Sequence, residues 1–177
     1  MAHSEREVLK LFDDHHLPLY RFAWRLTGSA ADAEDAVQEA FLGLLRPGCA
    51  FDPERSGIRT YLFGAVRNQC LKWLRRGRPL PDGRGSVSGE PLDVPDSRTP
   101  ESEALSGEVA DAVAAAVSAL PETQREVLIL AHYEQLSLAE IGEITRLEIG
   151  AVKSRLQRAR ATLRETLATY AHVEKNI

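Results

Sequence analysis

Residues 150–167, GAVKSRLQRARATLRETL, predict the long helix around which the rest of the chain is organised. At 100° per residue, one narrow stripe of this helix is apolar and suits packing on a small domain; it consists of Val152, Leu156, Ala159, Leu163 and Leu167. The opposite side carries hydrogen-bond donors of the kind that contact DNA phosphates and base edges, namely Lys153, Ser154, Gln157 and Arg158. For an isolated helix, a solvated basic surface explains the same pattern equally well.

The residues upstream favour DNA binding. Residues 136–147 predict a short helix, because Ser137 and Glu140 have the spacing of a capping box and Leu136 and Ile141 that of a hydrophobic staple. A turn at residues 145–148 leads into the long helix. Residues 120–133 predict a supporting helix with Pro121 at its start. Together these elements predict a helix-turn-helix on a small scaffold.

Length and composition exclude several classes of protein. The chain has 177 residues, 44% of them hydrophobic, which allows one soluble domain or two small ones. No apolar run approaches the roughly 20 residues of a membrane-spanning helix, and the amino terminus does not resemble a signal peptide, so we expect a cytoplasmic protein without membrane insertion. Cys49 and Cys70 are too far apart for a zinc knuckle, and His15 and His16 have no metal-binding spacing. We therefore expect two core thiols, no bound metal and no cofactor.

The net charge of −4 conceals two basic segments. Between residues 48 and 78 the only acidic residues are Asp52 and Glu54, and the basic ones are Arg55, Arg59, Arg67, Lys72, Arg75, Arg76 and Arg78. Between residues 145 and 164 the only acidic residue is Glu148, and the basic ones are Arg146, Lys153, Arg155, Arg158, Arg160 and Arg164. Two basic segments in an acidic chain indicate two separate contacts with a polyanion.

The amino-terminal part predicts three helices. Apolar residues near Val8 open the first, and a second begins at Pro18 and stops at Gly28. Ser29 can cap a third helix at residues 30–46, whose expected buried stripe is Ala33, Val37, Ala40, Phe41 and Leu44. The opposite side of this third helix combines carboxylates with an exposed leucine, which suits docking of a basic partner: Asp35, Gln38, Glu39 and Leu42. A solvated acidic surface with one stray leucine is the alternative.

A fourth helix is expected at residues 58–76, closed by Gly77. Its core side holds Ile58, Leu62, Val66, Gln69, Cys70 and Trp73. A second strip combines an aromatic ring, an amide and two cations, a mixture that suits single-stranded bases and their phosphates; it consists of Tyr61, Gly64, Asn68, Lys72 and Arg75. The alternative is an aromatic at the edge of the core beside solvated polar residues.

Residues 77–105 are rich in proline, glycine, serine and acid, without helical periodicity. Such a composition is typical of a flexible linker. An alanine-rich helix at residues 108–120 then begins the second half. The sequence therefore predicts an all-α protein of two small helical domains joined by a flexible linker.

Three segments now carry a family resemblance. They resemble, in order, three parts of the extracytoplasmic-function sigma factors. The segments are residues 32–41 (DAEDAVQEAF), residues 51–76 (FDPERSGIRTYLFGAVRNQCLKWLRR), and the pair 120–130 and 152–160 (LPETQREVLIL and VKSRLQRAR). These are the smallest class of the sigma-70 family, which directs bacterial RNA polymerase to promoters. The likeness covers nearly the whole chain outside the linker and the termini. It implies sigma region 2, a helical bundle, at residues 1–76, the linker at 77–105 and sigma region 4, a helix-turn-helix, at 106–177.

The resemblance also implies partners and site residues. It implies docking on the clamp helices of core RNA polymerase by Asp35, Gln38, Glu39 and Leu42. It places Asn68 at the pocket for a base flipped from the minus-ten element and Tyr61 near the melted strand, with Lys72, Arg75 and Arg76 along the backbone. It assigns minus-thirty-five recognition to Lys153, Ser154, Gln157 and Arg158. Promoter DNA and an anti-sigma factor are further implied partners.

The chain departs from the family pattern in and after the helix-turn-helix turn. Arg146 stands where glycine is usual, and Glu148 and Ala151 replace small hydroxyl residues at the start of the recognition helix. Glu148 favours the helix dipole but repels phosphate, so weaker or unusual minus-thirty-five binding stays open. Tyr61 stands where tryptophan is common and keeps the capacity to stack.

Two other functions remain open at this point. One is a sigma-like decoy that binds an anti-sigma protein without productive DNA contact, supported by Arg146, Glu148 and Ala151. The other is a two-domain DNA-binding regulator that acts without polymerase, against which the acidic surface around Asp35 argues. No catalytic constellation is visible in the sequence, so an enzyme is not expected.

Overall fold

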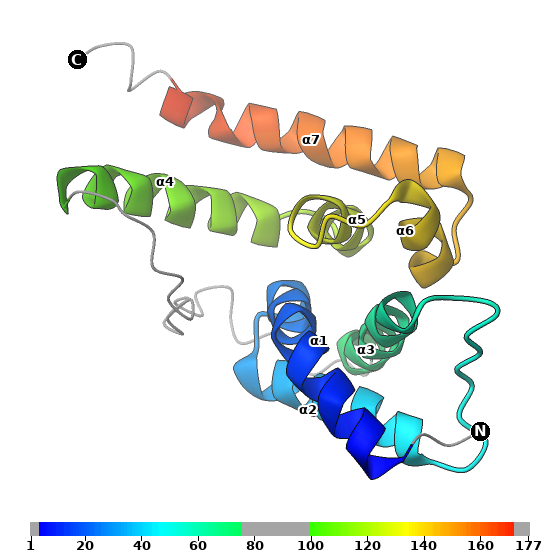
Figure 1. Cartoon of the computed structure of the whole chain (residues 1–177). Helices are drawn as coiled ribbons and strands as arrows, with labels where there is room; N and C mark the ends of the chain where they lie inside the picture. The colour runs from blue at the N-terminus through cyan, green and yellow to red at the C-terminus, as the bar shows by residue number, and fades with distance from the viewer. Residues whose placement is uncertain (1–3, 76–99, 172–177) are drawn as a thin grey trace.

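The computed structural model describes residues 4–75 and 100–171. Within these ranges every regular element is an α-helix, which confirms the predicted all-α class. The amino-terminal helices are α1 (Glu5–Thr27), α2 (Ala30–Leu45) and α3 (Ile58–Arg75). The carboxy-terminal helices are α4 (Pro100–Ser118), α5 (Glu122–His132), α6 (Leu138–Thr145) and α7 (Ile149–Ala171). In Figure 1, α4 and α7 run side by side, while α1, α2 and α3 form a separate bundle next to α5 and α6.

The α1–α3 bundle is built around aromatic and leucine side chains. Phe22 of α1 and Phe63 of α3 meet edge to face with their ring centroids 5.4 Å apart, and both are buried. Leu44 of α2 is also fully buried. The predicted α2 stripe of Ala33, Val37, Ala40, Phe41 and Leu44 is buried throughout, which confirms it. An edge-to-face aromatic pair adds about 1 kcal/mol to what area burial alone contributes.

Helix α1 runs without interruption through Pro18, so the prediction of two separate helices was wrong. A proline inside a helix removes one backbone hydrogen bond and costs about 3 kcal/mol. Here buried residues lie on both sides of the proline, Val8 before it and Leu19 and Phe22 after it. Packing of one long helix against α2 and α3 outweighs the local penalty. The predicted stop at Gly28 is confirmed, since Gly28 has φ +70° and caps α1.

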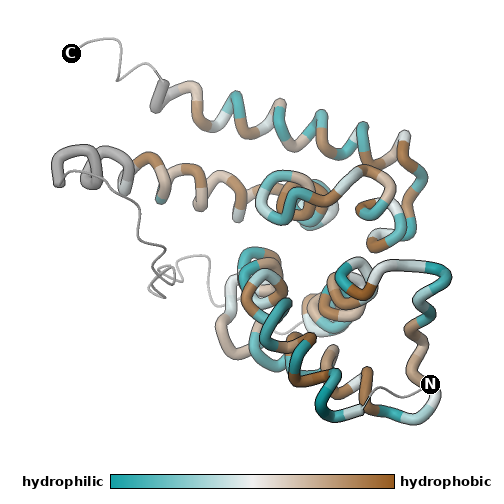
Figure 2. Tube along the Cα trace, in the orientation of Figure 1, coloured by the Kyte–Doolittle hydropathy of each residue, from teal (hydrophilic) through white to brown (hydrophobic). Residues whose placement is uncertain are grey.

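The carboxy-terminal half follows its local signals closely. Ser137 and Glu140 form the predicted capping box, and hydrogen bonds from Ser137 hold the pKa of Glu140 below its usual range. On α7, Val152, Leu156 and Ala159 are buried and Leu163 and Leu167 are half-buried. Figure 2 shows the resulting alternation of apolar and polar residues along α7. Helix α4 begins at Pro100, eight residues before the predicted start, and a proline suits the first turn of a helix.

Candidate polymerase and nucleic-acid interfaces

The outer side of α7 is exposed as the sequence predicts. Lys153, Ser154, Gln157 and Arg158 are all exposed, on the side of the helix opposite the buried stripe. The Ser154 hydroxyl donates to the backbone oxygen of Gly150 at 3.0 Å, so this side chain is bonded to its own helix. Lys153, Gln157 and Arg158 are thus the longer donors on this side. We call these four residues the reading surface.

The turn before α7 sets the angle at which the reading surface is presented. Arg146 caps α6 with a left-handed backbone, φ 58° and ψ 41°. Leu147 donates its backbone N–H to the oxygen of Gly142 at 3.0 Å. A Cβ on Gly142 would approach the Leu147 oxygen to 2.8 Å, so only glycine fits there without a shift. A left-handed non-glycine residue costs roughly 1–2 kcal/mol, and Arg146 bears this strain.

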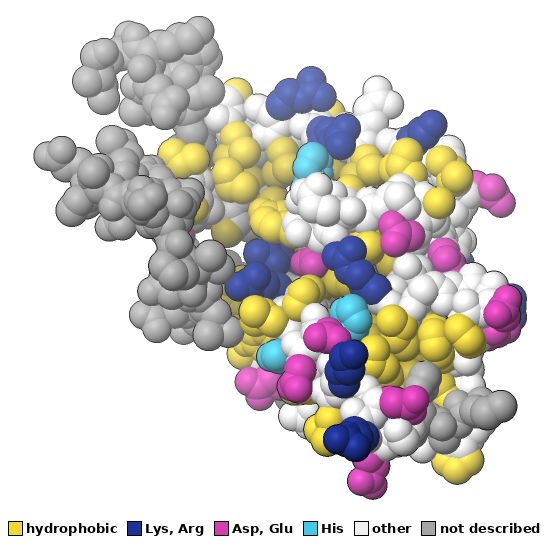
Figure 3. All heavy atoms as spheres, in the orientation of Figure 1, with side chains coloured by type: hydrophobic (Ala, Val, Ile, Leu, Met, Phe, Trp, Pro, Cys, Tyr) yellow, Lys and Arg dark blue, Asp and Glu magenta, His cyan; other side chains and the backbone are white. Residues whose placement is uncertain are grey.

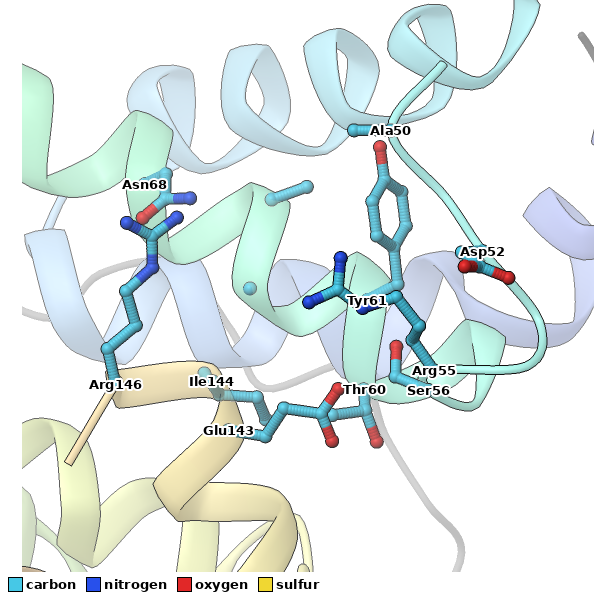
Figure 4. Close-up of a pocket in the computed structure, with 12 residues that line it drawn as sticks. Ala50, Asp52, Arg55, Ser56, Thr60, Tyr61, Asn68, Glu143, Ile144 and Arg146 are labelled. Carbon is cyan, nitrogen blue, oxygen red and sulfur yellow. The ribbon is translucent and has the colours of Figure 1, made fainter. Parts of the chain in front are cut away.

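The second predicted strip lies along α3, and its first half faces α6. Tyr61, Gly64 and Asn68 line a pocket of about 420 Å³ together with residues of the preceding loop and of α6. Figure 4 shows Arg55 and Asp52 entering from the loop and Glu143 and Arg146 from α6. Lys72 and Arg75 are exposed further along α3 and are not among the residues that line the pocket. Arg76, the last residue predicted for this strip, lies outside the described residues.

Tyr61 is held from one side. Its hydroxyl lies 3.7 Å from the sulfur of Cys49, and its ring lies 5.2 Å from that of Phe51, tilted by 57°. Burial, with a smaller contribution from the hydrogen bond to Cys49, raises the pKa of Tyr61 to about 12. The phenol therefore stays protonated at neutral pH. The loop fixes the ring's orientation before any ligand arrives.

The acidic surface on α2 is present, with one internal bond. Asp35 and Gln38 are exposed, and half of Leu42's surface is accessible, 50%. Glu39 accepts a hydrogen bond at 2.7 Å from Arg46, itself exposed at the end of the helix. Exposed ion pairs of this kind contribute at most about 1 kcal/mol and are easily exchanged for another cation. We call Asp35, Gln38, Glu39 and Leu42 the docking surface.

A cluster that the sequence did not reveal joins the two halves. Glu126 of α5 is 1% exposed, and its carboxylate accepts hydrogen bonds from Arg67 of α3 at 2.8 and 3.2 Å. Arg155 of α7 donates to the same carboxylate at 3.4 Å. The only signal in the sequence is an acidic residue next to the apolar run VLIL, and that signal does not name its partners.

A second set of contacts crosses the same junction. Arg59 of α3 donates to the backbone oxygen of Glu134 at 2.6 Å. Arg25 of α1 lies over the ring of Tyr133 at 4.2 Å and within 4.0 Å of the Glu134 carboxylate. Burial raises the pKa of Glu134 above its usual range, although Arg25 and Arg59 act in the opposite direction. Figure 3 shows basic side chains both over α7 and at this junction between the two halves.

Within 4–75 and 100–171, no group of three or more His, Cys, Asp or Glu side chains is arranged to hold a metal ion. No helix there is both long and apolar enough to cross a membrane. Cys70 is buried, as expected of a core thiol, and burial raises its pKa to about 12. Cys49 is only half-buried and contacts Tyr61.

Two family models match the chain. Sigma-70 region 2 matches residues 11–79, and Sigma-70, region 4 matches residues 110–163. The chain is 32% identical over 167 residues to the ECF RNA polymerase sigma factor SigW of Bacillus subtilis, covering 91% of this chain and 87% of that protein. It is 35% identical over 168 residues to the ECF RNA polymerase sigma factor SigL of Mycobacterium tuberculosis, covering 94% and 92%.

Two solved structures are similar to this chain over nearly its whole length. CnrH, in complex with the cytosolic domain of CnrY, aligns with a TM-score of 0.67 and 25% identity over 94% of this chain and 90% of that one. RpoE of Bartonella quintana, in complex with the anti-sigma factor NepR, aligns with a TM-score of 0.63 and 27% identity over 93% and 96%. The chain therefore belongs to the ECF sigma factors of the sigma-70 family.

Proposed function

We propose that this chain, an ECF sigma factor that directs promoter-specific transcription, acts through the three surfaces described above. The observation that carries the proposal is the reading surface: exposed donors lie on the second helix of a helix-turn-helix, opposite a buried stripe. A helix presented in this way fits the major groove, where long donor side chains can distinguish base pairs. Lys153, Gln157 and Arg158 contact the minus-thirty-five element, and Ser154 lies beside them.

The α3 strip takes the melted minus-ten strand. Asn68 hydrogen-bonds a base extruded from the stack, and Tyr61, held by Phe51 and Cys49, offers a ring beside it. Lys72 and Arg75 are exposed beyond Asn68 along the same helix and hold phosphates. Arg76 is assigned the same role from its place in the sequence. The order of residues along α3 thus separates base contacts from backbone contacts.

The docking surface binds the clamp helices of the polymerase's largest subunit. Its carboxylates Asp35 and Glu39 complement a basic partner, and the exposed Leu42 supplies an apolar contact beside them. Arg46 bonds Glu39 in the free chain and is exposed, so a polymerase cation can replace it at small cost. The sigma factor contributes no chemical step, because nucleotide addition belongs to the polymerase. It works in the cytoplasm, where polymerase and promoters are.

An anti-sigma factor is a further partner. Both CnrH and RpoE of Bartonella quintana are described in complex with another protein, the cytosolic domain of CnrY and the anti-sigma factor NepR respectively. The present chain covers at least nine tenths of each of those two chains, so the shared fold extends over both of its halves. We infer that its activity is restrained by a protein of the same class.

The test is promoter-dependent transcription by purified bacterial core polymerase with and without the chain. Templates are selected from the source genome by binding of the reconstituted holoenzyme. Asp35→Lys with Glu39→Lys reverses the charge of the docking surface and should abolish both polymerase binding and specific transcripts. Asp13→Lys with Asp14→Lys makes the same change in net charge on exposed positions of α1 and should leave both intact.

The outcomes separate the competing functions. Polymerase affinity that survives the docking-surface reversal would refute the assignment of those residues. A wild-type chain that binds DNA specifically but never binds polymerase would be an independent regulator. A chain that binds an anti-sigma protein but neither polymerase nor DNA would be a decoy.

A further inference from the structure

We propose that Ile149, the first residue of α7, is a further specificity-determining residue and contacts the C5 methyl group of a thymine in the minus-thirty-five element. The proposal rests on the role assigned above to the reading surface, whose side chains act through hydrogen bonds. Ile149 adds an apolar contact beside them. Such a contact selects one base by a different physical effect.

Ile149 is exposed although its side chain is large and apolar. Its exposed fraction is 46%, and the described residues contain four other large apolar side chains that are exposed, Leu9, Leu42, Val109 and Tyr133. None of those four lies in α6 or α7, the two helices of the helix-turn-helix. Of the five, Ile149 is therefore the one that lies on the helix carrying the reading surface.

Neither packing nor helix initiation explains an isoleucine at this position. Leu147, two residues earlier, packs against the hydrophobic core, and the buried stripe of α7 begins at Val152, whereas Ile149 is not part of that core. The first turn of a helix favours acidic residues and proline. Isoleucine is also a poorer helix former than alanine or leucine. The explanation for Ile149 therefore lies outside the folded chain.

Ile149 lies beside the reading surface. Residues four apart on a helix are neighbours, and the exposed Lys153 follows Ile149 by one turn. In Figure 1, the start of α7 lies on the side of α6 away from α3, so the amino-terminal half does not cover it. A recognition helix contacts base edges chiefly through its N-terminal residues. Ile149 is therefore in the part of α7 that reaches the bases.

The two residues after Ile149 leave room for a close approach of DNA. Gly150 does not have a left-handed backbone, and a Cβ added there would have no heavy atom within 4 Å. Nothing in the folded chain therefore requires glycine at this position, although glycine weakens a helix relative to alanine. Ala151 adds only a methyl group. No long side chain between Ile149 and Val152 holds the groove away from the isoleucine.

The chemistry of isoleucine selects thymine. Its side chain neither donates nor accepts hydrogen bonds, and in the major groove thymine is the base that presents a methyl group. Contact with the polar edge of another base would remove water from a donor or acceptor without replacing the hydrogen bond. Contact with the methyl group removes two apolar surfaces from water. Ile149 therefore favours thymine over the other bases at the position it contacts.

The test uses holoenzyme reconstituted with core polymerase and duplexes that carry the selected minus-thirty-five element. Deoxyuridine replaces each thymine in turn on either strand, which removes the methyl group and keeps the hydrogen-bonding atoms. We expect one such replacement to weaken binding by the wild type about fourfold, the effect of burying one methyl-sized group. In Ile149→Ala the same replacement should have no effect, because the side chain that contacts the methyl group is absent.

Val109→Ala is the matched control. Val109 is exposed by 47%, nearly the same fraction as Ile149, but lies on α4. This variant should keep the full fourfold sensitivity to the methyl group. Ile149→Val retains a branched apolar side chain and should keep most of that sensitivity. Thermal melting followed by circular dichroism establishes that Ile149→Ala is folded like the wild type.

Arg158→Ala separates failure of this proposal from failure of the proposed function. If Arg158→Ala weakens specific binding but no thymine methyl group affects the wild type, the reading surface stands and the role of Ile149 is refuted. Methyl sensitivity that persists in Ile149→Ala would also refute it. A loss confined to polymerase binding in Ile149→Ala would instead make Ile149 a protein contact. If neither Arg158→Ala nor any deoxyuridine changes binding, α7 does not read the element and both proposals fall.

Discussion

The basic residues of α3 and those of α7 differ in what they contact. On α7, Lys153, Gln157 and Arg158 are exposed on the reading surface, and Arg155 alone reaches the buried Glu126. On α3, Arg59 and Arg67 bond to the other half of the chain, and only Lys72 and Arg75 remain exposed among its described cations. The two helices α3 and α7 therefore have a similar density of positive charge in the sequence but differ in what their basic residues contact. Helix α7 leaves most of its charge exposed, where we propose that it contacts DNA, while α3 uses two of its arginines to hold the two halves together.

The largest expected effect comes from removing the acid at the centre of that junction. Glu126→Ala leaves two arginines facing a vacated, buried position, and loss of one partner from such a cluster costs about 3 kcal/mol. Chemical denaturation should show the free energy of unfolding falling by about this amount. Glu165→Ala, at an exposed position of α7, should change it by less than about 0.5 kcal/mol. Equal values for the two variants would mean that the junction does not stabilise the chain.

The next effect concerns the reading surface. Arg158→Ala should weaken minus-thirty-five recognition by the holoenzyme by about 2 kcal/mol, as expected for a bidentate contact with guanine. Arg160→Ala is the comparison on the same helix, because Arg160 donates to His132 at 3.2 Å, and its effect should be smaller. Competition binding with specific and scrambled duplexes measures both. A loss that is equal on the two duplexes would identify Arg158 as a phosphate contact.

The contrast within α3 predicts a difference in salt dependence. Lys72→Gln should make the negative slope of log affinity against log salt less steep by about 0.7 for binding of single-stranded DNA by the free chain, the value for one phosphate contact on a single strand. Arg59→Gln should leave the slope unchanged, since Arg59 is bonded to the Glu134 backbone. Titrations of the free chain, in which the junction is closed, at several salt concentrations provide the measurement. A less steep dependence with Arg59→Gln would mean that the junction opens and Arg59 then reaches DNA.

The smallest effect is a pH dependence of stability that comes from Tyr61 of α3. The pKa of Tyr61 is about 12 when folded, against about 10 for an unperturbed tyrosine, so the folded state holds this proton more tightly. Its contribution to stability is fully present below about pH 10 and is lost as the pH rises toward 12. Between about pH 9 and pH 11, wild type should therefore lose more stability than Tyr61→Phe. Urea denaturation at each pH measures the loss of stability. Identical losses in wild type and Tyr61→Phe would mean that Tyr61 lies in an ordinary solvent environment.

The elements that could be predicted from sequence are those fixed by neighbouring residues. The capping box at Ser137 and Glu140, the stop at Gly28 and the buried stripe of α7 each depend on side chains within a few turns of one another. The exposure of the reading and docking surfaces follows from the same periodicity. Pro18 was misjudged because its penalty is local, whereas the packing that overrides it involves two other helices.

The junction could not be predicted for a related reason. Glu126 bonds to Arg67, 59 positions away, and no local pattern links them. The sequence did single out Arg146 as a departure from glycine in the turn. It could not show that this side chain lines the same pocket as Asn68, because that depends on how the two halves meet. The sequence shows the charge of each residue but not which residue it contacts in the folded chain.

Gly142 gives the turn before α7 a consequence for engineering. The angle between α6 and α7 is set by backbone atoms, through the close approach of residue 142 to the Leu147 oxygen and the hydrogen bond that the Leu147 N–H donates to the Gly142 oxygen. None of the reading-surface residues takes part in that contact. If the proposed reading surface is correct, exchanging Lys153, Gln157 and Arg158 as a set should change promoter preference while the presentation of the helix stays constant. The reading surface and the turn that orients α7 are separable parts. This scaffold is therefore suited to building sets of transcription factors that do not act on one another's promoters.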